Sequence, residues 1–198
     1  LESLDELTIN TGCYWLADAS LEVKQNLPNI IGTIQNAYPE LDIFCTINPK
    51  KGGAAAIMNA EIRQKLVQSM VDFCTDQNLA GVDIDWEFPA EDQWDEFSDL
   101  IAELSAALSS SGRRLSLAFY PNVLDANEEK ANAAIEHLKA VIKASGKLGV
   151  GMVTTFIGQD QYKTIEENIQ LLQEIWPGLL PLAEEKGAQV ASENCPML

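Results

Sequence analysis

Basic residues and histidine are scarce in this chain. Its 198 residues include 13 lysines and arginines against 30 aspartates and glutamates, a formal net charge of −17, and a single histidine, His137. Such a charge repels phosphate backbones and anionic lipid headgroups, so we expect neither nucleic acid nor a membrane surface as a partner. A histidine-rich metal site or a Ser-His-Asp triad would have to be built around one side chain. We therefore expect no cofactor and no metal.

Long apolar runs and paired cysteines are also missing. No run approaches the roughly 20 apolar residues that span a bilayer, and the N-terminal "LESLDELT" lacks the basic flank and apolar core of a signal peptide. These absences predict a soluble protein and leave its compartment open. No C-x-x-C pair suggests a zinc knuckle or a redox motif, and we expect buried free thiols without disulfide bonds. The four cysteines are Cys13, Cys45, Cys74 and Cys195.

The chain does contain a regular alternation of two kinds of segment. Apolar runs rich in β-branched residues alternate with segments of 3.6-residue periodicity, which is typical of βα units around a parallel sheet. The expected strands cover residues 6–16, 41–48, 81–88, 113–120, 149–158 and 188–194. The expected helices cover residues 22–37, 59–77, 92–110, 127–146 and 164–186.

This count predicts an α/β fold that resembles a TIM barrel, with about six parallel strands and outer helices in one domain over residues 1–198. Six strands can close into a narrow barrel or leave an open sheet. Asn59 and the pair Thr164 and Glu167 provide capping residues for two helix starts. Gly146 and Gly187 are expected after the last turns of two helices, and Pro177 should kink the last helix near Trp176.

Three carboxylates occupy every second position of the third expected strand, within "AGVDIDWEFP" at residues 80–89. Successive side chains of a strand point to opposite faces, so Asp83, Asp85 and Glu87 share one face. An edge strand with one solvated face would show the same alternation. In an inner strand these acids are partly desolvated and cannot all ionise together, so at least one pKa rises. Glu87, at the carboxyl end, then becomes a candidate proton donor beside Asp85.

These residues carry a resemblance to a known family. "GVDIDWEFP" resembles the Asp-Gly-x-Asp-x-Asp-x-Glu signature of family 18 glycoside hydrolases, the chitinases and their relatives, on their fourth barrel strand. The signature maps onto Gly81, Asp83, Asp85 and Glu87, while Ala80 replaces its first aspartate. The resemblance extends over about residues 1–118.

For that family the resemblance implies a substrate-assisted mechanism. Glu87 would protonate the glycosidic oxygen, and the acetamido group of the substrate would attack the anomeric carbon. Asp85 would orient and stabilise that acetamido group, with Asp83 behind it. The tyrosine over the acetamido group and the aromatic floor under the sugar, which later strands of the family supply, have no recognised counterpart here.

The second half, residues 119–198, resembles a different family. Its tract "ENCPM" is similar to that of sugar phosphate isomerases and epimerases with a xylose isomerase-like TIM barrel. In that family the glutamate of this tract, here Glu193, is the first of several divalent-metal ligands. The other ligands belong to later strands, so Glu193 would be an isolated remnant of a metal site. Two resemblances that meet inside residues 113–120 suggest an engineered or recombined chimera of two barrel fragments.

Three functions remain open on this basis. The first is a chimeric βα scaffold with remnants of the chitinase acidic motif and no complete active site, hence no activity. The second is a weak family 18-type glycoside hydrolase that acts on N-acetylglucosamine polymers. The third is a carbohydrate-binding module for chito-oligosaccharides, with stacking surfaces from Tyr14, Trp15, Trp86 and Tyr120, although the parity of Trp86 favours packing against helices. An open sheet would also invite self-association through its edges.

Overall fold

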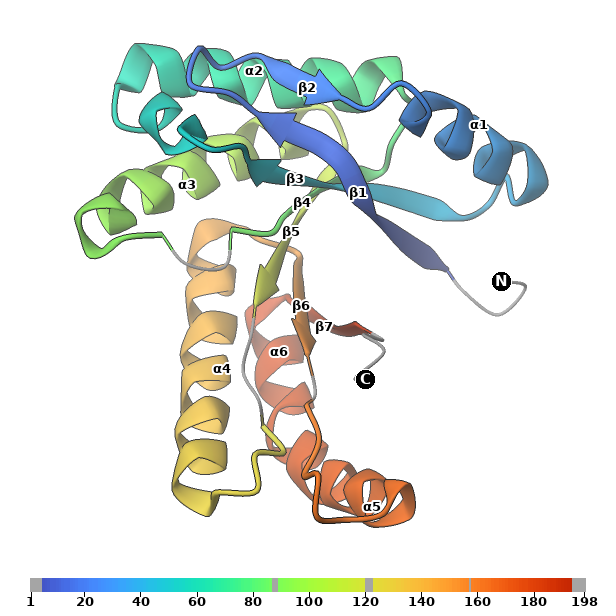
Figure 1. Cartoon of the computed structure of the whole chain (residues 1–198), viewed down its shortest axis with the longest axis vertical. Coiled ribbons are helices and arrows are strands. Elements are labelled where there is room, and N and C mark those ends of the chain that lie inside the picture. Colours follow the sequence, from blue (N-terminus) through green and yellow to red (C-terminus); the bar gives the residue numbers. More distant parts are fainter. Residues whose placement is uncertain (1–4, 87–88, 120–122, 157, 194–198) are drawn as a thin grey trace. The chain divides into compact units, whose positions relative to one another are not determined.

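The computed structural model of the chain describes residues 5–86, 89–119, 123–156 and 158–193 (Figure 1). The chain divides into two compact units, Leu1–Ser116 and Leu117–Leu198, with the division inside strand β5 (Arg114–Phe119). A single domain over residues 1–198 stays a prediction.

The first unit is built around four strands and the start of β5. In chain order its elements are β1 (Glu6–Trp15), β2 (Leu21–Val23), α1 (Leu27–Ala37), β3 (Asp42–Pro49), η1 (Gly53–Ala56), α2 (Ala60–Asp76), β4 (Gly81–Ile84), η2 (Glu91–Gln93) and α3 (Trp94–Ser110). The strand order is β2-β1-β3-β4-β5. Strands β1, β3 and β4 run parallel, whereas β2 pairs with β1 in the antiparallel direction.

The short strand β2 corrects the predicted start of the first helix. A helix was expected from residue 22, but residues Leu21–Val23 pair with β1 and α1 begins only at Leu27. Proline at the second helical position, Pro28, explains this start, because a proline lacks the N–H that a helix interior requires but fits the first turn.

The second unit contains two long helical segments and a pair of strands. Its elements after β5 are α4 (Glu128–Leu148), β6 (Met152–Phe156), α5 (Ile165–Ile175), η3 (Trp176–Gly178), α6 (Leu180–Lys186) and β7 (Gln189–Glu193). Strands β6 and β7 are parallel, and α4 packs beside α6. The core of this unit consists of Val123, Leu124, Leu138, Ile142, Val153, Leu179 and Ala183. The expected kink is confirmed, because η3 starts at Trp176 and separates α5 from α6.

Six of the seven strands fall within or beside the six expected segments, and the α/β class with a mostly parallel sheet is confirmed. Among the described residues, β2 and β7 stand at the two ends of the strand order. The choice between a closed barrel and an open sheet stays a prediction. No helix in the described part of the chain is long and apolar enough to cross a membrane.

The expected helix caps are largely confirmed. Asn59 Oδ1 accepts hydrogen bonds from the backbone N–H groups of Glu61 and Ile62, at 3.0 and 3.1 Å. Thr164 and Glu167 form the reciprocal capping box, with bonds of 3.2 and 2.8 Å. Gly187 caps α6 with a left-handed φ of 69°.

The cap predicted at Gly146 is wrong, because α4 continues through it to Leu148 and Gly149 adopts the left-handed conformation. Gly146 instead allows a close approach of α6. A Cβ atom at this position would lie 2.8 Å from the carbonyl oxygen of Lys186.

Candidate active site

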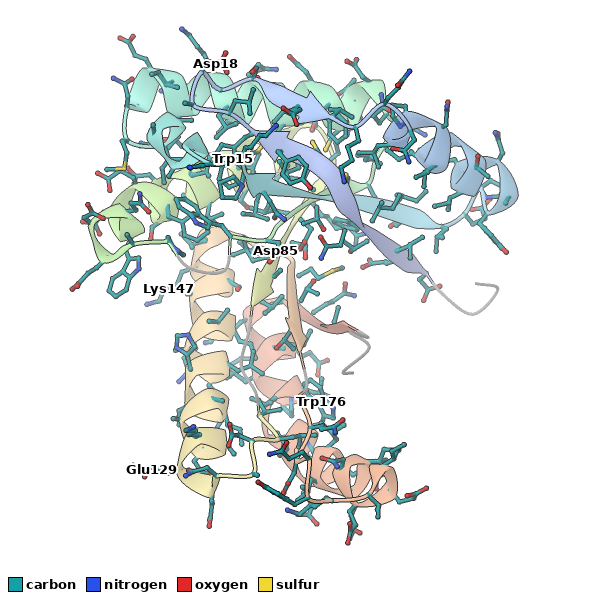
Figure 2. The ribbon with its side chains drawn as sticks, viewed as in Figure 1. Trp15, Asp18, Asp85, Glu129, Lys147 and Trp176 are labelled. Carbon is teal, nitrogen blue, oxygen red and sulfur yellow. The ribbon has the colours of Figure 1, made fainter. Side chains whose placement is uncertain are left out.

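The acidic segment begins on β4 and continues beyond its end. Strand β4 covers only Gly81–Ile84, although the sequence predicted a strand as far as residue 88. Asp85 and Trp86 therefore lie past the strand, at its carboxyl end (Figure 2). The parallel register with β3 would place Pro49 beside Trp86 if the ladder continued, and a proline has no N–H to donate to it. The expectation that alternate side chains share one face of a strand therefore applies to Asp83, which lies on β4, but not to Asp85, which lies beyond it.

The glycine of the motif, Gly81, allows β4 to lie very close to its neighbouring strands. A Cβ atom at Gly81 would lie 2.0 Å from the carbonyl oxygen of Arg114 on β5 and 2.6 Å from Cε1 of Phe44 on β3. The N–H of Arg114 also donates to the carbonyl oxygen of Ala80 at 3.0 Å. Any side chain at position 81 would thus push β5 away from β4. This close packing sets the position of the acid that follows.

Asp83 is a fully buried acid held by two hydroxyl groups. It is 0 % exposed, and its Oδ2 accepts a 3.0 Å hydrogen bond from Oγ1 of Thr46, its register partner on β3. The hydroxyl of Ser116 on β5 also hydrogen-bonds this carboxylate. Burial raises the pKa of Asp83 to about 6, the two hydroxyls oppose this rise, and the nearby charge of Asp85 adds to it. The structure thus has the raised pKa that the sequence predicted for at least one acid, at Asp83.

Trp86 is packed between two other aromatic rings. Its ring centroid lies 5.8 Å from that of Trp15 on β1 and 5.3 Å from that of Phe97 on α3, both in edge-to-face geometry. Trp15 is fully buried, and its Nε1 donates to the carbonyl oxygen of Gly53 at 3.1 Å. These contacts anchor the chain directly after Asp85. They also confirm the expectation that Trp86, whose position alternates with those of the acids, packs against a helix, here through Phe97 on α3.

The stacking surface expected from four aromatic residues is only partly present. Trp15 has no exposed face, so the expectation that it stacks on a sugar is wrong. Tyr14 is half-buried, with Nζ of Lys24 at 6.0 Å from its ring centroid. Tyr120 lies outside the described residues.

Two further predicted site residues lie wholly or partly outside the described residues. Glu87 lies outside the described residues, between Trp86 and Pro89. The backbone of Glu193 ends β7, but its side chain lies outside what the structure describes. Within residues 5–86, 89–119, 123–156 and 158–193, no group of three or more histidine, cysteine, aspartate or glutamate residues could hold a metal ion.

Sequence reasoning missed the polar partners of the acidic segment. The two partners of Asp83, Thr46 and Ser116, lie on β3 and β5, far from the motif in the sequence. Asn48 follows Thr46 by two positions on β3, and its buried Oδ1 has no hydrogen-bond partner among the described residues. The only signal in the sequence was a polar residue within each apolar strand.

The cysteines behave as expected in the described part of the chain. Cys13, Cys45 and Cys74 are buried free thiols, while Cys195 lies outside the described residues. A hydrogen bond with Cys13, together with burial, raises the pKa of Cys45, and burial raises the pKa of Cys74 to about 12. Thiols with raised pKa values are poor nucleophiles at neutral pH, so Cys45 and Cys74 are structural.

The fold and the acidic segment define an α/β protein of βα units, in which acids lie at the carboxyl end of an inner parallel strand. The model of the family described as glycosyl hydrolases family 18 matches residues 10–145. The chain belongs to this family.

Individual proteins share part of this sequence or its fold. A probable chitinase 10 of Drosophila melanogaster is 36 % identical over an alignment of 87 residues, which covers 38 % of this chain and 4 % of that protein. A class V chitinase from Pseudomonas fluorescens Pf-5 has a similar fold, with a TM-score of 0.60, 16 % identity, and coverage of 78 % of this chain and 47 % of that chain. The group IV chitinase of Ostrinia furnacalis in complex with allosamidin gives a TM-score of 0.56 and 19 % identity, over 77 % of this chain and 42 % of that chain. This chain thus spans less than half the length of these proteins.

The range of the family match does not support the predicted chimera of two barrel fragments. It runs to residue 145, past the junction that the sequence suggested within residues 113–120. The comparisons give no evidence for a sugar isomerase component or for an engineered fusion. The family 18 alternative is therefore better supported than the inactive chimeric scaffold.

Proposed function

We propose that this chain is a chitinase-like glycoside hydrolase domain that acts on N-acetylglucosamine polymers. Membership of family 18 supports the reaction class, and the Ostrinia relative binds allosamidin in its solved structure. The observation that carries the proposal is the buried Asp83, with its pKa raised to about 6, next to Asp85 at the end of β4. This pair directly precedes Glu87, the expected proton donor.

Each acid has a distinct role in the proposed reaction. Glu87 donates its proton to the glycosidic oxygen as the bond to the leaving sugar breaks. The carbonyl oxygen of the substrate's own acetamido group attacks the anomeric carbon, so no carboxylate of the protein acts as nucleophile. Asp85 accepts a hydrogen bond from the acetamido N–H and holds the group in the attacking orientation. A protonated Asp83 would remove one negative charge beside Asp85, which eases the approach of these acids.

Oligosaccharide binding without hydrolysis is the second candidate, because this chain departs from the motif at Ala80. The N–H of Ala80 donates to the carbonyl oxygen of Ile43 at 2.9 Å, and its carbonyl oxygen accepts from Arg114 at 3.0 Å. The backbone at this position is thus fixed between β3 and β5 without the carboxylate of the family signature. Without that acid, one charge fewer acts on the pKa values of the other acids in the motif. The site that remains could still recognise the sugar.

Release of a fluorescent aglycone from a chitobioside tests the proposed reaction. We expect turnover above the buffer rate in the unmodified chain and a loss of at least about 100-fold in Glu87→Gln, because an amide cannot donate the required proton. Glu40→Gln is the matched control, since Glu40 is an exposed acid in the connection before β3, at the end of that strand away from the acidic segment. It should keep full activity, with both variants folded by circular dichroism.

Turnover indistinguishable from buffer in the unmodified chain would remove the hydrolase proposal. Calorimetric titration with a chito-oligosaccharide then decides the second candidate, because heat of binding without product would support recognition alone. Equal activities of Glu87→Gln and the unmodified chain would show that another group is the acid.

A further inference from the structure

Large apolar side chains are exposed at one edge of the first unit. Among the described residues of this unit, Met58 is 46 % exposed and Trp94 is 56 % exposed. Met58 precedes α2 in the connection from β3, and Trp94 is the first residue of α3 in the connection from β4. In a βα unit the helix begins near the carboxyl edge of the sheet. Asp85 leaves β4 at this same edge, so the helix that begins with Trp94 starts on the acidic side of the unit.

The ring of Trp94 is held in place although it is exposed. Its Nε1 donates to the carbonyl oxygen of Pro89 at 3.3 Å, and its backbone carbonyl accepts from Oγ of Ser98 at 2.8 Å. The turn before it is closed by a 2.9 Å hydrogen bond from the N–H of Ala90 to Oε1 of Gln93. A ring fixed before binding loses little conformational entropy when a ligand covers its face.

The charges around Trp94 select the chemistry of the ligand. Four acids flank the ring on the same segment, and residues 81–112 contain no lysine or arginine. The acids are Glu91, Asp92, Asp95 and Glu96. An anionic ligand would be repelled here, whereas the hydroxyl and amide N–H groups of a neutral sugar can donate to these carboxylates. The C–H groups on one face of a pyranose ring are apolar and match an aromatic face.

We propose that Trp94 is a sugar-binding residue whose ring stacks on an N-acetylglucosamine unit of the oligosaccharide that enters the acidic site. The inference rests on the proposed function and assigns part of its substrate-binding surface. It explains why a tryptophan that is more than half exposed has a fixed orientation at this edge. Met58 is a second exposed apolar side chain of this unit, in the connection before α2.

Calorimetric titration with an N-acetylglucosamine tetramer tests this assignment. We expect Trp94→Ala to raise the Kd at least about tenfold, which equals about 1.4 kcal/mol of binding free energy. Trp94→Phe keeps an aromatic face and should stay within about threefold of the unmodified chain. Leu180→Ala is the control, because Leu180 is 50 % exposed at the start of α6, in the second unit. It should leave the Kd unchanged.

The results of this titration and of the chitobioside assay distinguish the role of Trp94 from the proposed hydrolase function. An unchanged Kd in Trp94→Ala overturns the role of Trp94, while chitobioside hydrolysis can still stand. Absence of any binding to the unmodified chain overturns the inference as well, and the hydrolysis assay then decides the function separately. A cationic peptide is the competing ligand for a tryptophan among acids. Binding of oligolysine that depends on Trp94 and disappears between about 50 and about 500 mM NaCl, with no sugar binding, would also overturn it.

Discussion

At the residue scale, Asp83 shows how burial and hydrogen bonding oppose each other. Removal from water disfavours its charged form, while Thr46 and Ser116 donate hydrogen bonds that favour it. Burial has the larger effect, so the pKa of Asp83 rises to about 6. The folded chain therefore contains an acid that changes its charge near neutral pH, two positions before Asp85 in the proposed site.

This pKa predicts how stability depends on pH. Since the folded pKa of Asp83 is about 6 and its ordinary value is 3.8, the folded chain binds the proton more tightly than the unfolded chain. Its contribution to the free energy of unfolding is fully present below about pH 4 and is lost as pH rises through about 6, a change of about 3 kcal/mol. Urea denaturation of the unmodified chain and Asp83→Asn, at a series of pH values, measures the difference.

Asp83→Asn should gain stability relative to the unmodified chain as pH rises from about 4 to about 7, because the amide never ionises. The exposed acid Asp92 provides the control, and Asp92→Asn should follow the unmodified chain at every pH. Parallel pH profiles for Asp83→Asn and the unmodified chain would show that Asp83 keeps an ordinary pKa.

At the scale of elements, a single arginine joins α2, α3 and the loop before α2. Nε and Nη2 of Arg63 donate to Oε1 of Glu103 at 3.1 and 2.9 Å, and Nη2 also donates to Oδ2 of Asp99 at 3.0 Å. Its Nη1 donates to the carbonyl oxygen of Ile57 at 3.0 Å. Only 8 % of the Arg63 side chain is exposed, so this network is largely shielded from solvent. It fixes the helices whose first residues lie near the acidic edge.

Arg63→Met should therefore destabilise the chain by about 2 to 4 kcal/mol, because it leaves the partly buried Glu103 and a backbone carbonyl without their donor. Lys139→Met removes an exposed ion pair with Glu136 and should change the free energy of unfolding by less than about 0.5 kcal/mol. Urea denaturation of both variants gives the two values. Similar small losses in both would mean that the Arg63 network contributes no more than a surface pair.

At the scale of the whole molecule, the edges of the outermost described strands and the net charge act in opposite directions. Strands β2 and β7 end the strand order, and an unpaired strand edge can bind another chain. The net charge of −17 repels a second copy at long range, and salt screens this repulsion. We infer that self-association through the sheet edges is weak at low salt and stronger at high salt.

Light scattering across micromolar concentrations tests this inference. The average mass should exceed that of one chain and increase from about 50 to about 500 mM NaCl. The N–H of Gln189 donates to Gly151 beside β6, so the N–H of the next residue, Val190, points to the free edge of β7. Val190→Pro should reduce the association, provided that the variant stays folded. A single-chain mass under all conditions would rule out association through the sheet edges.

The sequence by itself determined the alternation of strands and helices, most helix caps and the family signature, because these depend on local periodicity and side-chain chemistry. It predicted that one acid of residues 83–87 would have a raised pKa, but only the tertiary structure identified Asp83 as that buried acid. Thr46 and Ser116 reach Asp83 from strands distant in sequence, and strand pairing alone decides such contacts. Likewise, only the structure showed that the pairing of β4 with β3 ends at Ile84, before Asp85. Whether six strands close or stay open depends on their mutual register, which the sequence pattern of each strand does not contain.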